Sequence, residues 1–175
     1  MIPPVFALPF EVREWFLECD WTPHYRAAVP DSIPRDHPAY DVLENFGGIK
    51  LLERDCSADD EPIVEFYFRA VVYREVDSWM RRWERRLRTT LISIAEEHNG
   101  HAELYIDSYG RCFSNSLMHA CFMFAGETFV DMLIGQLHHR RKRPLLPRFQ
   151  HSVHIYGEEI YRGDPRIWDY TQHIH

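Results

Sequence analysis

The sequence predicts a single α+β domain, in which a largely antiparallel or mixed sheet of about six short strands packs with about four helices. Three observations lead to this prediction. The chain has 175 residues, of which 45% are hydrophobic and 14% aromatic, enough for one packed core. Four segments carry apolar residues at helical spacing. Between them lie short segments rich in β-branched and aromatic residues, mostly joined by hairpin turns.

The helices are delimited by proline, glycine and the spacing of large apolar residues. Pro9 can open the first helix, because proline is tolerated in the first turn. Gly47 is expected to stop the second helix in the left-handed conformation that commonly ends helices. In the third helix, Trp79 and Trp83 mark a packed side, while its arginines face solvent. The four helices are expected over residues 10–19, 37–46, 75–90 and 129–137.

The strands follow from short apolar runs bounded by turn residues. Asn99-Gly100 accommodates positive φ at low cost and predicts a turn, and Ser108-Tyr109-Gly110 joins two alternating segments into a hairpin. Consecutive strands joined in this way pair antiparallel. The six strands are expected over residues 49–53, 63–69, 91–95, 104–107, 111–114 and 121–125.

The pattern weakens toward the C-terminus. Residues 145–175 interleave aromatics and histidines with prolines and glycines. We therefore divide the chain into a folded domain over residues 1–144 and a C-terminal extension over residues 145–175. The extension is expected to consist of extended segments that are packed on the domain or partly loose.

Composition narrows the class of protein. With 27 acidic and 20 basic residues the net charge is −7, which discourages nonspecific binding to nucleic acid or membrane and suits a basic partner. No apolar run approaches the ~20 residues of a membrane-spanning helix. The four cysteines are scattered, without a CxxC pair, and no signal peptide is recognised. We expect a cytoplasmic protein with reduced, structural thiols.

Three short motifs occur in a fixed order, and each solves a packing or backbone problem. Trp21 is a large apolar anchor, and Arg26 is suited to pair with a carboxylate or to cap carbonyls. Glycines after a helix permit a sharp turn, and an Asp-x-x-Gly hairpin offers a carboxylate to backbone N–H groups. The scaffold residues of these motifs are Trp21, Arg26, Phe46, Gly47, Gly48, Asp107, Gly110 and Arg111.

The order of these motifs resembles the SUKH superfamily. Trp21 to Arg26 matches its Trp-x-Pro-x-x-Arg segment, Phe46-Gly47-Gly48 its Phe-Gly-Gly, and Ile106 to Arg111 its Ile-Asp-x-x-Gly-Arg hairpin. The similarity covers residues 10–137. It implies an immunity protein that binds a cognate bacterial polymorphic toxin, often a nuclease or deaminase. Such a protein acts without cofactor or turnover, and we expect a monomer or weak homodimer when free.

Other chemistries find weaker support in the residues. The histidine pairs 138/139, 151/154 and 173/175 lack the spacing of known metal sites, so no metal is expected. Cys112, Ser114 and Ser116 lie near His119 in the sequence, but no nucleophile signature surrounds them. Two basic clusters, at 81–88 and 138–143, are read as pairing with the chain's own acids rather than with nucleic acid.

An acidic stretch is the strongest surface signal. Residues 41–65 contain eight acidic residues against only two basic ones, Lys50 and Arg54. A solvated loop would explain this pattern, as would a face that meets a cationic toxin. A general interaction module of the same fold, with a regulatory role, is the alternative to toxin immunity. The residues expected to contact the toxin are Asp41, Glu44, Asp55, Asp59, Asp60, Glu61 and Glu65.

Overall fold

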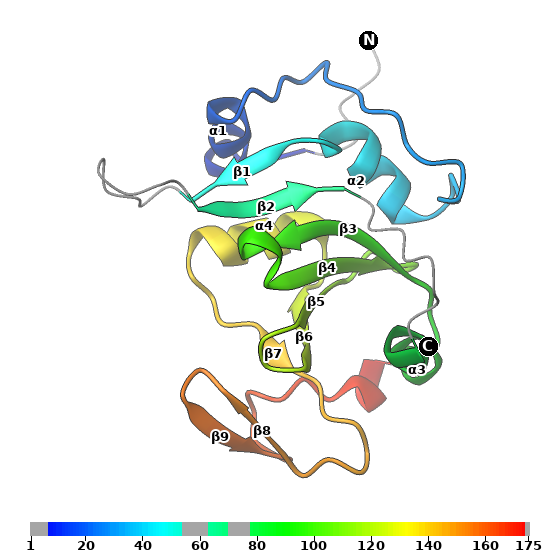
Figure 1. Ribbon diagram of the computed structural model, residues 1–175, viewed down its shortest axis with the longest axis vertical. Helices are drawn as coiled ribbons and strands as arrows, with labels where there is room; N and C mark the ends of the chain where they lie inside the picture. Colours follow the sequence, from blue (N-terminus) through cyan, green and yellow to red (C-terminus); the bar gives the residue numbers. More distant parts are fainter. Residues whose placement is uncertain (1–6, 54–62, 70–77, 174–175) are drawn as a thin grey trace.

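Seven strands form one antiparallel sheet in sequential order, and a separate two-stranded hairpin follows it (Figure 1). The computed structural model describes residues 7–53, 63–69 and 78–173. Within these ranges the helices are α1 Phe10–Glu18, α2 Pro38–Phe46, α3 Ser78–Leu87 and α4 Phe129–Leu137, with 3₁₀ turns η1 His98–Gly100 and η2 Tyr170–His173. The sheet strands are β1 Lys50–Leu52, β2 Val64–Phe68, β3 Leu91–Glu97, β4 Ala102–Asp107, β5 Cys112–Ser116, β6 Cys121–Gly126 and β7 Arg143–Pro144. The hairpin is β8 Ser152–Ile155 with β9 Glu158–Tyr161.

The predicted fold class is confirmed: the chain is a single α+β domain with an antiparallel sheet. All four expected helices and all six expected strands are present within a few residues of their expected bounds. The start expected for the third helix, at residue 75, lies outside the described residues. Strand β3 continues to Glu97, two residues beyond its expected end. The additional strands β7, β8 and β9 all lie at or after residue 143, where the apolar pattern is weakest.

One face of the sheet is covered by α1, α2 and α4. Their apolar sides form a core with β2, β3 and β4 in which aromatic rings dominate. Phe16 and Phe46 lie 4.5 Å apart between ring centroids, and Phe46 and Phe129 lie 5.4 Å apart, joining the three helices. Such pairs add stability beyond the area that they bury. Figure 1 shows α1 and α2 beside the β1–β2 end of the sheet.

The opposite face of the sheet packs against α3 and the end of the chain. The Trp83 ring of α3 stacks on Phe122 of β6, with centroids 5.0 Å apart. From the other end of the chain, Trp168 stacks on Phe124, and the centroids are 4.6 Å apart with a 2° angle between the rings. Residues near the C-terminus therefore belong to the same core as the third helix.

The β8–β9 hairpin forms a third core with the last sheet strands. Val153, Ile155 and Ile160 pack against Cys121 and Met123 of β6. Figure 1 shows this hairpin at the end of the molecule opposite α1 and α2. The C-terminal stretch is thus made of extended segments packed on the sheet over its described residues, to 173.

The Trp21–Arg26 segment joins α1 to the end of α2. The buried Trp21 ring lies 5.6 Å from both Phe16 and Phe46, between centroids, and its indole N–H donates to the carbonyl of Asn45 at 2.8 Å. The exposed Arg26 guanidinium donates to backbone carbonyls of its own turn. Of the two roles open to Arg26, the structure therefore shows carbonyl capping.

The turn from α2 to β1 corrects the expectation for Gly47. Gly47 has φ −54°, an ordinary value, and the positive φ of 88° belongs to Gly48. Position 47 needs glycine for space, because a Cβ there would lie 2.5 Å from the carbonyl oxygen of Leu43. The Gly48 N–H donates to the backbone carbonyl of Phe68 at 2.7 Å, and this hydrogen bond starts the pairing of β1 with β2.

The β4–β5 turn is held by a buried ion pair. The Asp107 carboxylate, 0% exposed, accepts the backbone N–H groups of Tyr109 at 3.0 Å and Arg111 at 2.9 Å. It also accepts the Arg111 Nε–H at 2.8 Å. Gly110 takes the expected positive φ, 88°. Arg111 donates in turn to the carbonyl of His173 at 2.9 Å, so the turn is connected to the C-terminal segment.

Replacing Trp168 by alanine should reduce the free energy of unfolding by about 3–5 kcal/mol, because the ring is 1% exposed and its loss leaves a cavity between the sheet and α3. Urea unfolding followed by far-UV circular dichroism measures this. Tyr161→Ala, at a ring 64% exposed, is the control and should change stability by less than about 0.5 kcal/mol. If both substitutions changed the free energy of unfolding by similarly small amounts, the C-terminal segment would not be part of the cooperative core.

Candidate functional site

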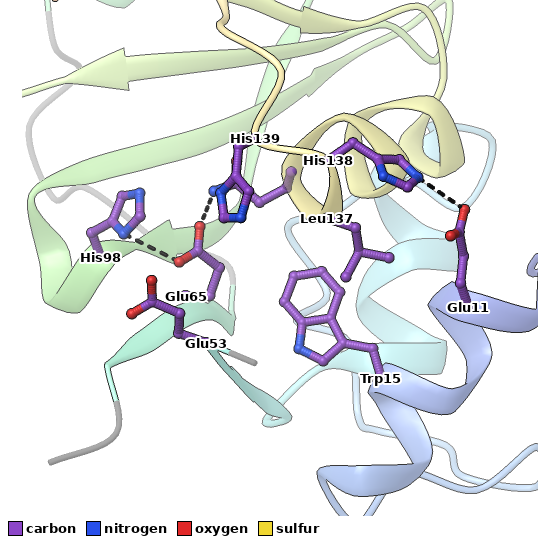
Figure 2. A pocket seen from close by; sticks show the side chains of 9 residues that line it. Glu11, Trp15, Glu53, Glu65, His98, Leu137, His138 and His139 are labelled. Atoms are coloured by element: carbon purple, nitrogen blue, oxygen red, sulfur yellow. Dashed lines mark hydrogen bonds and ion pairs between the residues drawn. The ribbon is translucent and has the colours of Figure 1, made fainter. Parts of the chain in front are cut away.

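A pocket of about 450 Å³ opens between α1, the C-terminal end of α4 and the β1–β2 end of the sheet. Its walls come from segments far apart in the sequence, because α1 and α4 cover the same face of the sheet. Most lining side chains are acidic or imidazole groups (Figure 2). The lining residues are Glu11, Trp15, Glu53, Glu65, His98, Gln136, Leu137, His138 and His139.

Glu65 is the most deeply placed of the three carboxylates. It belongs to β2, is 5% exposed, and accepts a hydrogen bond from the Gln136 side chain of α4. The His98 Nδ1 lies 3.3 Å from its second oxygen. Burial raises the pKa of the Glu65 carboxyl above its usual value of 4.5, and attraction to His98 partly opposes the rise. The carboxyl group is therefore held in an environment that resists its charge.

The rim of the pocket carries further histidines. His138 Nε2 lies 3.3 Å from the Glu11 carboxylate, and both side chains are partly exposed. Figure 2 shows the His139 ring between α4 and Glu65, pointing toward the carboxylate. The pocket thus presents three carboxylates, Glu11, Glu53 and Glu65, beside three imidazole rings.

One wall of the pocket is apolar. The Trp15 ring stands beside Leu137, and its indole N–H donates to the carbonyl of Leu52 at 2.7 Å (Figure 2). The Trp15 ring is only 2% exposed, so it supports this wall from within the core while Leu137 is partly buried. This is a binding geometry, since it presents carboxylates and imidazoles beside an apolar surface.

The acidic residues expected to contact a partner are placed differently. Glu65 lies in the pocket, where its carboxylate accepts a hydrogen bond from Gln136 and lies beside His98. Asp41 and Glu44 are half-buried on α2, away from the pocket lining. Four of them lie outside the described residues: Asp55, Asp59, Asp60 and Glu61. Their role in an interface stays a prediction.

Sequence reasoning missed Glu11 and His98 as members of one site. Glu11 is one acid among many in the sequence, and His98 belongs to a predicted turn. The sequence marks His138 and His139 as a metal candidate and as the start of a basic cluster, not as members of this site. Over residues 7–53, 63–69 and 78–173, no three His, Cys, Asp or Glu side chains converge to hold a metal ion.

The suspected nucleophiles lie in the sheet interior. Cys112 and Ser114 are both 0% exposed, and burial raises the pKa of the Cys112 thiol well above its usual value. Burial also raises the pKa of Cys121 to about 12. A thiol that resists ionisation is a poor nucleophile, so both groups fit the structural role expected from the sequence.

The fold is a small α+β domain with a carboxylate-lined and imidazole-lined pocket at one end of its sheet. A family model described as SUKH-3 immunity protein matches residues 36–138, more than half of the chain. The chain therefore belongs to the SUKH-3 immunity protein family. No curated protein and no solved structure matches it. None of the helices in the described ranges has the length and apolar character needed to cross a bilayer.

Glu65→Gln should flatten the pH dependence of stability. Because the folded-state pKa of Glu65 is raised, the folded protein binds the extra proton. The resulting stability is fully present below the usual pKa of 4.5 and is lost as pH rises through the raised value. Urea unfolding across this window should show that loss in the wild type, and the variant should lack it.

The glutamine side chain of the E65Q variant keeps an oxygen for the Gln136 hydrogen bond, and the surrounding Glu53, Glu97, His98 and Lys142 stay in place. The control is Glu127→Gln, at an exposed position. Parallel wild-type and E65Q curves would contradict the prediction.

Proposed function

We propose that this protein is an immunity protein that binds a cognate bacterial polymorphic toxin of the nuclease or deaminase type and occludes it. It acts in the cytoplasm by tight binding, without cofactor or turnover. Membership of the SUKH-3 immunity protein family supports the class of function. The observation that carries the proposed mode of binding is the carboxylate-lined pocket beside β1 and β2.

Two members of the acidic stretch, Glu53 and Glu65, line this pocket. Strands β1 and β2 pair antiparallel, and the Glu53 N–H donates to the carbonyl of Ile63 at 2.9 Å. Residues 54–62, which carry four of the acids expected to contact the toxin, lie outside the described residues; in the sequence they connect Glu53 to Ile63. Glu53 itself lines the pocket.

Charge of this kind accelerates encounter with a cationic partner and selects against acidic ones. A toxin that acts on nucleic acid needs a basic substrate surface, and an acidic immunity protein complements such a surface. The partly exposed Leu52 and Ile63, at the same edge of the sheet, offer apolar contact area. Apolar groups of this kind supply much of the binding energy once water is excluded.

The proposal is tested by mixing purified protein with the product of the adjacent toxin-like gene in a calorimeter at low and at physiological salt. Nanomolar one-to-one binding that weakens with salt is expected, because the steering charges are screened. Absence of binding at micromolar concentrations would reject that pairing. A regulatory interaction module of the same fold would then be the better description.

Reversing Asp59, Asp60 and Glu61 to lysine should weaken toxin binding more than about tenfold, mainly through slower association. The matched control reverses Asp31, Asp36 and Glu127, which are exposed and lie elsewhere. Both variants change the net charge equally and should keep the wild-type thermal midpoint. Surface plasmon resonance gives the rates. If the variant with lysine at positions 59–61 bound the toxin with unchanged affinity, residues 59–61 would not be part of the interface.

A further inference from the structure

Helix α3 presents a cationic face that the proposed function does not use. Met80, Trp83 and Leu87 are buried against the sheet. The opposite side of the helix carries the exposed Arg81, Arg82 and Arg85, placed there by the helical period, and the exposed Arg88 follows directly after the helix with a positive φ of 53°. Because α3 packs on the face of the sheet opposite α1 and α4, this arginine face is remote from the carboxylate-lined pocket.

Within the described part of the chain, no ion pair joins these four guanidinium groups to a carboxylate. Arg82 and Arg85 donate through Nε to carbonyls one turn earlier in their own helix. The acid on the helix, Glu84, accepts the backbone N–H of Leu91 at 3.0 Å. Among residues 7–53, 63–69 and 78–173, the arginine face is therefore not neutralised by ion pairs.

The other basic cluster of the chain is different. Arg140, Arg141 and Lys142 are all engaged by acids of this chain: Asp131 at 2.9 Å, Glu158 at 3.1 Å and Glu97 at 2.5 Å, respectively. The sequence-based interpretation that basic clusters pair with the chain's own acids thus holds for residues 140–142. It does not hold for the described neighbours of α3.

The arginine face is also hollowed. Arg81, Arg85 and Arg88 surround a hollow of about 770 Å³, together with Glu84 and Thr89. Arg81 and Arg85 are four residues apart, so they lie along one side of the helix about 6 Å apart, and Arg88 joins them from the turn after the helix. Guanidinium groups at such spacing match a short row of carboxylates, each of which accepts two parallel N–H bonds.

We propose that the arginine face of α3 binds an acidic protein segment, one that presents clustered aspartate or glutamate side chains. The site is independent of toxin binding at the carboxylate-lined pocket, since the two lie on opposite faces of the sheet. The partner supplies carboxylates to the arginines that no described carboxylate of this chain pairs with. Binding is then salt-dependent and centred on Arg81 and Arg85.

Two other occupants fit the structure less well. A nucleic acid needs a basic track, but the cationic surface does not continue into residues 140–142, whose charges are paired. A second copy that offered its acidic pocket to α3 would leave the same two surfaces open at each end, a non-closing arrangement that is rare among soluble oligomers.

The test uses the full-length protein and two labelled probes of equal length, an oligoglutamate peptide and an oligothymidylate. Fluorescence anisotropy gives their affinities at low and at physiological salt. Arg81→Glu/Arg85→Glu should weaken binding of the peptide at least about tenfold, and Arg81→Gln/Arg85→Gln by a smaller factor. The charge-matched control is Arg13→Glu/Arg35→Glu, at exposed arginines elsewhere, and it should bind like the wild type.

Thermal unfolding shows whether each variant is folded. If the glutamate variant is unfolded, the comparison is made with the glutamine variant. Peptide binding that is lost only in the α3 variants supports the proposal. Preference for the oligothymidylate, equal loss in the control, or no peptide binding would overturn it. Self-association that disappears in R81E/R85E, seen by sedimentation without peptide binding, would assign the face to a second copy instead.

Discussion

The central strands carry apolar side chains on both faces, and the rest of the structure depends on covering them. Along β6, Phe122 and Phe124 face α3, while Met123 and Ala125 face the other side. Side chains alternate between faces in a strand, so neither face can be left to solvent without exposing a row of large groups. Helices α1, α2 and α4 cover one face only. Helix α3, Trp168 and the β8–β9 hairpin complete the covering.

This constraint explains why the C-terminal segment is held by more than apolar contact. Arg111 joins the buried Asp107 to the carbonyl of His173, and its guanidinium lies 5.7 Å from the centre of the Trp168 ring. Removing one partner of a buried ion pair strands the other charge, which is costlier than losing a surface pair. The turn between β4 and β5 therefore positions the segment that closes the second core.

Covering the two faces by different elements also separates the charged surfaces. The carboxylate-lined pocket forms where α1 and α4 meet the β1–β2 edge, and the arginine face lies on α3 across the sheet. Opposite charges held on opposite faces do not neutralise each other within one molecule. The net charge of −7 conceals this division, because it sums over both surfaces.

The sequence by itself determined the helices, the order of the main strands and the family motifs, because these depend on local periodicity and on turn residues. It could not place the β8–β9 hairpin, whose two strands are only four residues each and gain their stability from packing against Cys121 and Met123. The sequence also led us to expect the positive φ at Gly47, because either glycine permits the turn. The structure has it at Gly48, and glycine is needed at position 47 because a Cβ there would meet the Leu43 carbonyl.

The candidate site was decided by tertiary structure alone. Glu11, Glu65 and His139 are separated by more than fifty residues from one another, and each has an ordinary local context in the sequence. They meet because α1 and α4 pack side by side over the end of β2. For the arginine face, the helical period predicted which side of α3 is solvated. Only the folded chain shows which acids lie close enough to pair with its arginines, because pairing depends on distance in space and not along the sequence.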